Sequence, residues 1–187
     1  MIIVDVETTG LDPQENSILS IGAVDFSNPK NQFYGECGVI EGREINPIAL
    51  KINGFKEKDI RAKEKSAKEL FQELIQWSKS VKDKTLGGYY THFDQSFLLD
   101  TARTYRLEWP FGIHLVDIHS LFYTFMLQKK TVRLESGVSN YSLDEILVYF
   151  GLPPEPHPHN ALTGAKITAE AFSKILFGKS IFKELYK

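Results

Sequence analysis

Residues 2–10 read IIVDVETTG, an apolar run that holds two acidic side chains and ends in a glycine. Such a short run rich in Val and Ile is typical of a β-strand, whose side chains alternate between two faces. Asp5 and Glu7 are therefore expected on one face, while Val4 and Val6 face the core. Like charges this close repel unless a cation neutralises them, and Mg²⁺ or Mn²⁺ prefers oxygen ligands. The pair is equally compatible with the solvated face of an edge strand.

The composition is that of an ordinary globular protein. Of the 187 residues, 42% are hydrophobic and 25% are charged, and we expect a single domain over residues 1–187. The 22 Lys and Arg residues nearly balance the 24 Asp and Glu residues, giving a net charge of -2. This balance excludes a polybasic arm that binds nucleic acid by charge alone. It leaves a nucleic-acid enzyme open, because a site for divalent cations is itself acidic.

The sequence also bears on the cellular setting. The single cysteine, Cys37, has no partner for an intrachain disulfide, so a reducing compartment is expected. No stretch approaches the ~20 apolar residues needed to cross a bilayer, and the first residues do not resemble a targeting segment. We therefore expect a cytoplasmic protein.

Residue patterns divide the chain into strands and helices. Short runs rich in Val, Ile and Phe, bounded by turn residues, predict strands at 2–6, 18–26, 32–40, 86–90 and 113–117. Apolar residues at helical spacing and capping residues predict helices at 66–81, 93–105, 118–127, 142–150 and 160–177. Three strands in succession, followed by alternating helices and strands, predict an α/β fold with a mixed sheet flanked by helices.

Two later segments carry side chains suited to catalysis. Asp94 lies in the first turn of the predicted helix 93–105, where it can project over the carboxyl ends of the strands. Capping of that helix is the alternative interpretation of Asp94. His159 follows the Pro-rich turn 153–158, and histidine is suited to general base work near neutral pH. A histidine in a surface loop is the alternative there.

Taken in order, these three segments resemble the DEDDh, or DnaQ-like, family of 3'-5' exonucleases, which have a ribonuclease H-like fold. Residues 5–10, DVETTG, match the family's Asp-x-Glu-Thr-Thr-Gly, and residues 93–98, FDQSFL, match its Phe-Asp-x-x-Phe-Leu. The family's His-x-Ala-Leu-x-Asp-Ala is matched by His159, Ala161, Leu162 and Ala165. Residues 50–55, LKINGF, are similar to the family's Ile-x-Gly-Ile segment beside the terminal nucleotide. The resemblance implies a five-stranded mixed sheet, with a three-strand antiparallel meander and two parallel strands.

The resemblance also implies an activity and the residues that perform it. The family hydrolyses DNA or RNA from the 3' end, releases nucleoside monophosphates and uses two Mg²⁺ or Mn²⁺ ions. The implied catalytic residues are the metal ligands Asp5, Glu7 and Asp94 and the base His159, which takes the proton of the attacking water. The implied substrate-binding residues are Thr8, Thr9, Gly10, Leu11, Ile52, Asn53, Phe93 and Phe97, although core packing is the preferred interpretation of Phe97.

One departure from the family pattern concerns a metal ligand. The family's fourth acid stands five residues after the histidine, where this chain has Gly164. The neutral oxygen donors Asn160 and Thr163 lie nearby and are candidates to replace it in part. The missing carboxylate implies one ion, or weakly bound ions, and low turnover. The alternative is a non-catalytic module that keeps the fold and binds a nucleic-acid 3' end or a polymerase partner.

Overall fold

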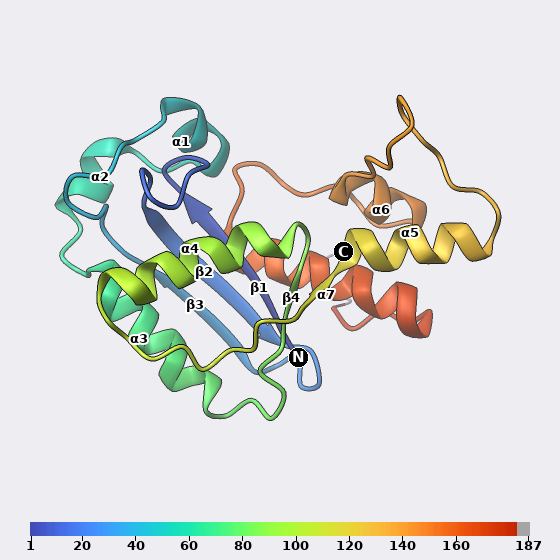
Figure 1. The fold of residues 1–187 in the computed structure, drawn as a ribbon, viewed down its shortest axis with the longest axis horizontal. Helices are drawn as coiled ribbons and strands as arrows, with labels where there is room; N and C mark the ends of the chain where they lie inside the picture. Colours follow the sequence, from blue (N-terminus) through green and yellow to red (C-terminus); the bar gives the residue numbers. More distant parts are fainter. Residues whose placement is uncertain (183–187) are drawn as a thin grey trace.

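The structure is a computed structural model that describes residues 1–182. Its strands are β1 (Ile2–Thr8), β2 (Ile18–Asp25), β3 (Gln32–Glu36), β4 (Leu86–Gly88) and β5 (Leu115–Asp117). Its helices are α1 (Pro47–Asn53), α2 (Glu57–Ala62), α3 (Ala67–Ser78), α4 (Thr91–Thr104), α5 (Ile118–Gln128), α6 (Leu143–Tyr149) and α7 (Ala161–Phe177). The strands form a 5-stranded sheet in the order β3-β2-β1-β4-β5. Figure 1 labels β3, β2, β1 and β4 side by side in this order.

The sheet is mixed, as the sequence predicts. β1, β2 and β3 pair antiparallel in chain order, whereas β4 runs parallel to β1 and β5 runs parallel to β4. β1 is thus a central strand with a hydrogen-bonded neighbour on each side. The edge-strand interpretation of its acid pair is therefore wrong, and both acids lie within a layered fold.

Alternation along β1 assigns its side chains to two cores, one on each face of the sheet. Val4 and Val6 pack with residues of α3 and α4, whereas Ile3 packs with residues of α5, α6 and α7. Figure 1 shows α4 crossing one face of the sheet and α7 lying behind the strands. Because Asp5 and Glu7 alternate with the valines, they share the face of Ile3 and point toward α7.

The two short helices α1 and α2 lie in a stretch for which the sequence predicted no element. Helix α1 nevertheless has clear end residues: the Asn46 side chain accepts a hydrogen bond from the Ile48 nitrogen, and Pro47 opens the helix. Gly54 closes it in the left-handed conformation, at a φ of 75°. Each helix is too short to show a clear apolar period, which is the pattern on which the prediction relied.

Strand β3 is shorter than predicted, ending at Glu36 rather than at residue 40. Beyond it, the nitrogen of Gly38 donates to Lys65 and that of Val39 to Ile60, so the chain turns from β2 toward the α2 region. The other predicted elements are present, with ends shifted by a few residues. No helix among the described residues is long and apolar enough to span a membrane. That residues 1–187 form one domain stays a prediction.

The first turn of α7 lies directly on the backbone of β2 at Gly22. An added Cβ at Gly22 would lie 2.1 Å from the carbonyl carbon of Ala161 and 2.2 Å from the nitrogen of Leu162. No side chain fits into that space, so only glycine permits this packing. Gly22 is the partner of Asp5 in the β1–β2 ladder. The close approach therefore places the start of α7 beside the acid pair.

We expect Gly22→Ala to destabilise the fold by about 1–3 kcal/mol, because the added methyl group collides with backbone that cannot move without leaving the sheet. Urea unfolding followed by circular dichroism measures the loss. The matched control is Gly112→Ala, since a Cβ there meets no heavy atom nearer than 4.0 Å. We expect that control to stay within about 0.5 kcal/mol of the parent. Equal losses in the two variants would contradict the packing argument.

Candidate functional site

A pocket opens at the end of β1, and most of the predicted site residues line it. Its residues come from β1 and the loop after it, from α1, from the start of α4 and from the loop before α7. They are Asp5, Val6, Glu7, Thr8, Gly10, Leu11, Ala49, Ile52, Asn53, Phe93, Glu155 and His159. Segments that are far apart in the sequence therefore meet at this pocket.

Asp94 lies directly beside the acid pair. Its Oδ1 accepts a hydrogen bond of 3.0 Å from the backbone nitrogen of Val6, the residue between the two acids of β1. The side chain is buried, with 3% of its surface exposed. Burial raises the pKa of Asp94 well above its usual value, although the hydrogen bond from Val6 works in the opposite direction. The main chain of β1 thus holds this carboxylate in place.

A different acid, Asp117, satisfies the start of α4. The N-cap residue of α4, Tyr90, makes no capping hydrogen bond through its side chain. The Thr91 nitrogen instead donates to Oδ2 of Asp117 at 2.9 Å. The other oxygen of Asp117 caps α5, accepting from the His119 nitrogen at 2.9 Å. The structure therefore does not support the capping interpretation of Asp94.

The acids of this pocket are held without a cationic partner. Among the described residues, Asp5 and Glu7 form no ion pair or side-chain hydrogen bond, and Glu7 is only 8% exposed. Burial raises the pKa of Asp5 well above its usual value, and the charges of Asp94, Glu7 and Glu155 raise it further. Burial, and then Glu155, raises the pKa of Glu7 from 4.5 to about 8. The fold thus holds these carboxyl groups together against desolvation and mutual repulsion.

The donor set suits a hard divalent cation by its chemistry. Asp5, Glu7 and Glu155 offer carboxylate oxygens, the ligands that Mg²⁺ and Mn²⁺ prefer. The hydroxyl of Ser20, which faces Glu7 across the β1–β2 ladder, has no hydrogen-bond partner either. These side chains do not converge on one point, however. Within residues 1–182, no group of three or more His, Cys, Asp or Glu side chains is close enough to hold a metal ion as it stands. The pocket therefore has the donors of a cation site without its closed geometry.

His159 lies at the edge of the same pocket. Its backbone nitrogen donates to the carbonyl oxygen of Ile52 at 3.0 Å, which ties the loop before α7 to α1. Its Nδ1 is 3.8 Å from Oε2 of Glu155, and its ring stacks on that of His157 with centroids 4.6 Å apart. Burial, and then His157, lowers the pKa of His159 below its usual value. The imidazole is therefore neutral near pH 7 and able to accept a proton.

Gly164 faces Asp5, and an unpredicted acid borders the same place. An added Cβ at Gly164 would lie 2.4 Å from Oδ2 of Asp5 and 3.2 Å from Oε1 of Glu155. Sequence reasoning did not single out Glu155. One feature points to it, namely an acid four residues before His159 in a loop stiffened by prolines.

The neutral donors Asn160 and Thr163 are used elsewhere. Oδ1 of Asn160 accepts from the nitrogens of Leu162 and Thr163 and so caps α7. Its Nδ2 donates to the hydroxyl of Tyr34, and the Thr163 hydroxyl donates to Asn160. Neither residue lines the pocket. The structure does not support the expectation that they replace the missing acid in part, because the start of the helix takes up their polar groups.

The predicted substrate-binding residues separate into two groups. Those that line the pocket are Thr8, Gly10, Leu11, Ile52, Asn53 and Phe93. Leu11 is 81% exposed and Ile52 44% exposed, so apolar surface is available at the pocket rim. Thr9 and Phe97 lie elsewhere, since Thr9 is fully buried with its hydroxyl bonded to Glu44, and Phe97 belongs to the core. The core-packing interpretation of Phe97 is confirmed.

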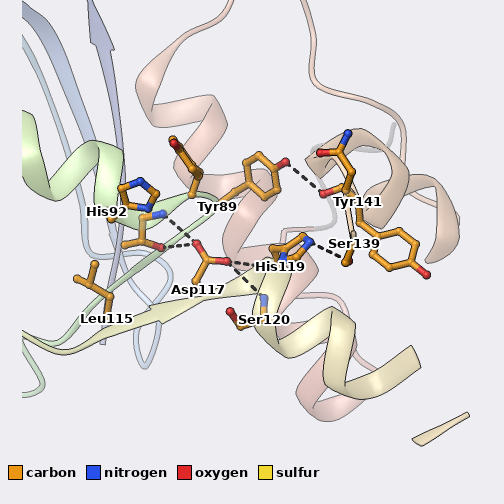
Figure 2. A pocket seen from close by; sticks show the side chains of 11 residues that line it. Tyr89, His92, Leu115, Asp117, His119, Ser120, Ser139 and Tyr141 are labelled. Carbon is orange, nitrogen blue, oxygen red and sulfur yellow. Dashed lines mark hydrogen bonds between the residues drawn. The ribbon is translucent and has the colours of Figure 1, made fainter. Parts of the chain in front are cut away.

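A second cavity lies between the starts of α4 and α5 and is larger, about 420 Å³ against about 210 Å³ (Figure 2). In it, Oγ of Ser139 and Nε2 of His119 are 3.1 Å apart. Asp117 bonds to the backbone nitrogen of His119 and not to its ring, so it does not orient the imidazole as a catalytic triad requires. Asp117 thus caps two helices, and the Ser139–His119 pair lacks the third member of a triad.

The chain is similar to known exonucleases over most of its length. A family model described as "Exonuclease", RNase_T, matches residues 2–172. The chain belongs to this exonuclease family. It is 30% identical over 178 residues to DNA polymerase III PolC-type of Thermotoga maritima, covering 94% of this chain and 12% of that protein. It is 27% identical to the 3'-5' DNA exonuclease Cap18 of Escherichia coli, covering 93% of this chain and 90% of that protein.

Solved exonuclease structures share the fold of this RNase_T family member. The nuclease domain of 3'hExo, a DEDDh family member bound to rAMP, superposes with a TM-score of 0.73 at 16% identity, covering 96% of this chain and 92% of that one. E. coli Exonuclease I in complex with a dA16 oligonucleotide gives a TM-score of 0.75 at 16% identity, covering 95% of this chain and 40% of that one. The predicted ribonuclease H-like fold with a five-stranded mixed sheet is thereby confirmed.

Without divalent cations, we expect the protein to lose stability as the pH rises from 4.5 to about 8. Folded Glu7 keeps its proton up to about pH 8, whereas the unfolded chain releases it near 4.5, so the unfolded state binds fewer protons in this window. The loss per such group is at most about 1.4 kcal/mol per pH unit. Urea unfolding in EDTA at a series of pH values measures this slope. Glu7→Gln should flatten it, and an unchanged slope would contradict the burial of an unneutralised Glu7.

Proposed function

We propose that this chain is a metal-dependent 3'-5' exonuclease that acts on DNA or RNA 3' ends and releases nucleoside monophosphates. The observation that carries the proposal is the meeting of the β1 acid pair and His159 around one pocket, with Asp94 held beside the pair by the Val6 nitrogen. Among the described residues, no cationic side chain pairs with the β1 acids. Membership of the exonuclease family and the exonuclease relative Cap18 support it.

The carboxylates would hold the metal at the end of β1. Asp5 and Glu7 project from alternate positions of a central strand, and the Val6 nitrogen holds Asp94 beside them. Mg²⁺ or Mn²⁺, when bound, activates water and stabilises the charge that develops on the scissile phosphate. The protein's part is to position that chemistry, since β1 is fixed by strands on both sides.

His159 would accept the proton of the attacking water. Its lowered pKa keeps the imidazole neutral at the pH at which it must act. The hydrogen bond from its backbone to Ile52 fixes the loop at the pocket rim. Exposed Leu11 and Ile52 at this rim would support the terminal base through apolar contact.

Two finer parts of the proposal concern the ion count and the partner. Gly164 leaves α7 without a carboxylate at the position of the family's fourth acid, so we propose one ion, or weakly bound ions, unless another acid takes that place. We also propose a polymerase as partner, because relatives of this chain carry the names DNA polymerase III PolC-type and DNA polymerase III subunit epsilon. The chain spans 12% of the length of the PolC-type protein that it matches.

Release of labelled mononucleotide from a 3'-labelled single-stranded oligomer, in Mg²⁺ and in Mn²⁺, tests the proposal. We expect cleavage by the parent chain and a loss of about 10²–10⁴-fold in kcat for His159→Asn, the usual contribution of a general base. The matched control is His114→Asn, which should retain activity because His114 is exposed and does not line the pocket. DNA and RNA oligomers of one sequence, compared side by side, identify the substrate class.

Binding of the oligomer without cleavage in either metal would contradict the enzyme and favour the non-catalytic module. In that case binding is expected to be independent of divalent ions and insensitive to His159→Asn. Equal losses in the two histidine variants would also contradict the role given to His159.

A further inference from the structure

The place that Gly164 leaves open on α7 is bordered by an acid from the preceding loop. The point at which a Cβ of Gly164 would lie is 2.4 Å from Oδ2 of Asp5 and 3.2 Å from Oε1 of Glu155. A side chain at position 164 would therefore enter the site between these two carboxylates. Glu155 brings its carboxylate to the same place from the loop instead of from the helix.

The fold keeps the Glu155 carboxylate at this place. Its backbone nitrogen donates to Oδ1 of Asp144 at 2.8 Å, and Pro154 and Pro156 restrict the loop on either side. The Glu155 side chain is 15% exposed, and no Lys or Arg among the described residues pairs with it. Its nearest partner is Nδ1 of His159 at 3.8 Å, which is too long for a hydrogen bond. A largely buried carboxylate without a partner is costly unless a cation binds it.

A second, independent side chain points to the same ligand. Glu7 is 8% exposed and lines the same pocket as Glu155. Within the described part of the chain, its carboxylate makes no hydrogen bond and no ion pair. Ser20, its neighbour across the ladder, likewise has an unpaired hydroxyl. Glu7 and Glu155 thus come from separate segments and face one cavity without partners. A bound divalent cation would supply the missing partner to both.

We infer that Glu155 is the fourth acidic ligand of the cation site, supplying from the loop the carboxylate that α7 lacks at Gly164. The identity of the ion as Mg²⁺ or Mn²⁺ rests on the proposed function, whereas the binding itself does not depend on cleavage. Glycine at 164 leaves room for this arrangement, because a Cβ there would lie 2.4 Å from Oδ2 of Asp5 and would require that carboxylate to shift. The site keeps four acids, two from β1, one from α4 and one from the loop.

Binding of Mn²⁺ to the metal-free protein, without nucleic acid, tests this inference. Free Mn²⁺ is measured by electron paramagnetic resonance at pH 8 for the parent chain, for Glu155→Gln and for the matched control Glu41→Gln. Glu41 is exposed and does not line the pocket of the acids. We expect Glu155→Gln to weaken Mn²⁺ binding at least about 10-fold and Glu41→Gln to leave it unchanged. Unchanged affinity in Glu155→Gln, or no Mn²⁺ binding by the parent chain, overturns the inference.

Two further variants keep the test decisive if Glu155→Gln folds poorly. Glu155→Asp retains the charge on a shorter side chain, and its Mn²⁺ affinity should fall between those of the parent and the Gln variant. The double variant Glu155→Gln/Gly164→Asp returns a carboxylate to α7 once the loop acid is neutral, and it should recover part of the lost affinity. Circular dichroism and the metal-free Tm establish that each variant is folded. If the double variant is folded but recovers no Mn²⁺ affinity, a carboxylate at position 164 does not replace the one at position 155, which counts against the inference.

The same readout separates this inference from the proposed exonuclease. If the parent chain cleaves no oligomer but Glu155→Gln loses Mn²⁺ binding, Glu155 is upheld as a ligand and the proposed exonuclease activity is refuted. If the parent chain cleaves the oligomer and Glu155→Gln binds Mn²⁺ as tightly as the parent does, only the role of Glu155 as a ligand is refuted. A role limited to orienting His159 predicts reduced cleavage with unchanged Mn²⁺ affinity, and this outcome also overturns the inference.

Discussion

At Gly22 the backbones of β2 and α7 approach so closely that no methyl group fits between them, since a Cβ there would lie 2.1 Å from Ala161. This contact sets the distance between the helix and the sheet. Asp5 is the ladder partner of Gly22, so it faces the turn of α7 that makes the contact. Gly164, in the same part of the helix, again lacks a side chain. The two glycines together let the loop before α7 reach the acids of β1.

Asp5 and Glu7 stay close to one another at the end of β1, although burial and mutual repulsion both disfavour their charged forms. A surface loop would relieve the repulsion by moving outward. β1 cannot do so, because it has a paired strand on each side and its valines are buried under α3 and α4. The unfavourable interaction therefore remains at the pocket, and the rest of the fold supplies the stability that sustains it. The cation that we propose for this pocket would relieve the repulsion before any substrate arrives.

Local patterns predicted the parts of the site that depend on local geometry. Alternation along a strand was enough to place Asp5 and Glu7 on one face. The place of Asp94 in the first turn of a helix predicted that it lies near the strand ends, but its hydrogen bond from Val6, 88 residues away in sequence, could not be predicted. Glu155 was missed because a Pro-rich turn has no periodicity that shows where its side chains point. Its position depends on how closely α7 packs on the sheet, and that distance follows from Gly22, whose role is not visible in the sequence.

The parts of the pocket lie far apart along the chain, with the acids of β1 near residue 5 and the histidine at residue 159. During synthesis the acids of β1 emerge from the ribosome well before the base. A nascent or partly unfolded chain therefore carries charge at the end of β1 but has nothing positioned to deprotonate water. The hydrolysis that we propose would thus begin only when α7 docks, so the completed fold itself acts as the safeguard against premature cutting.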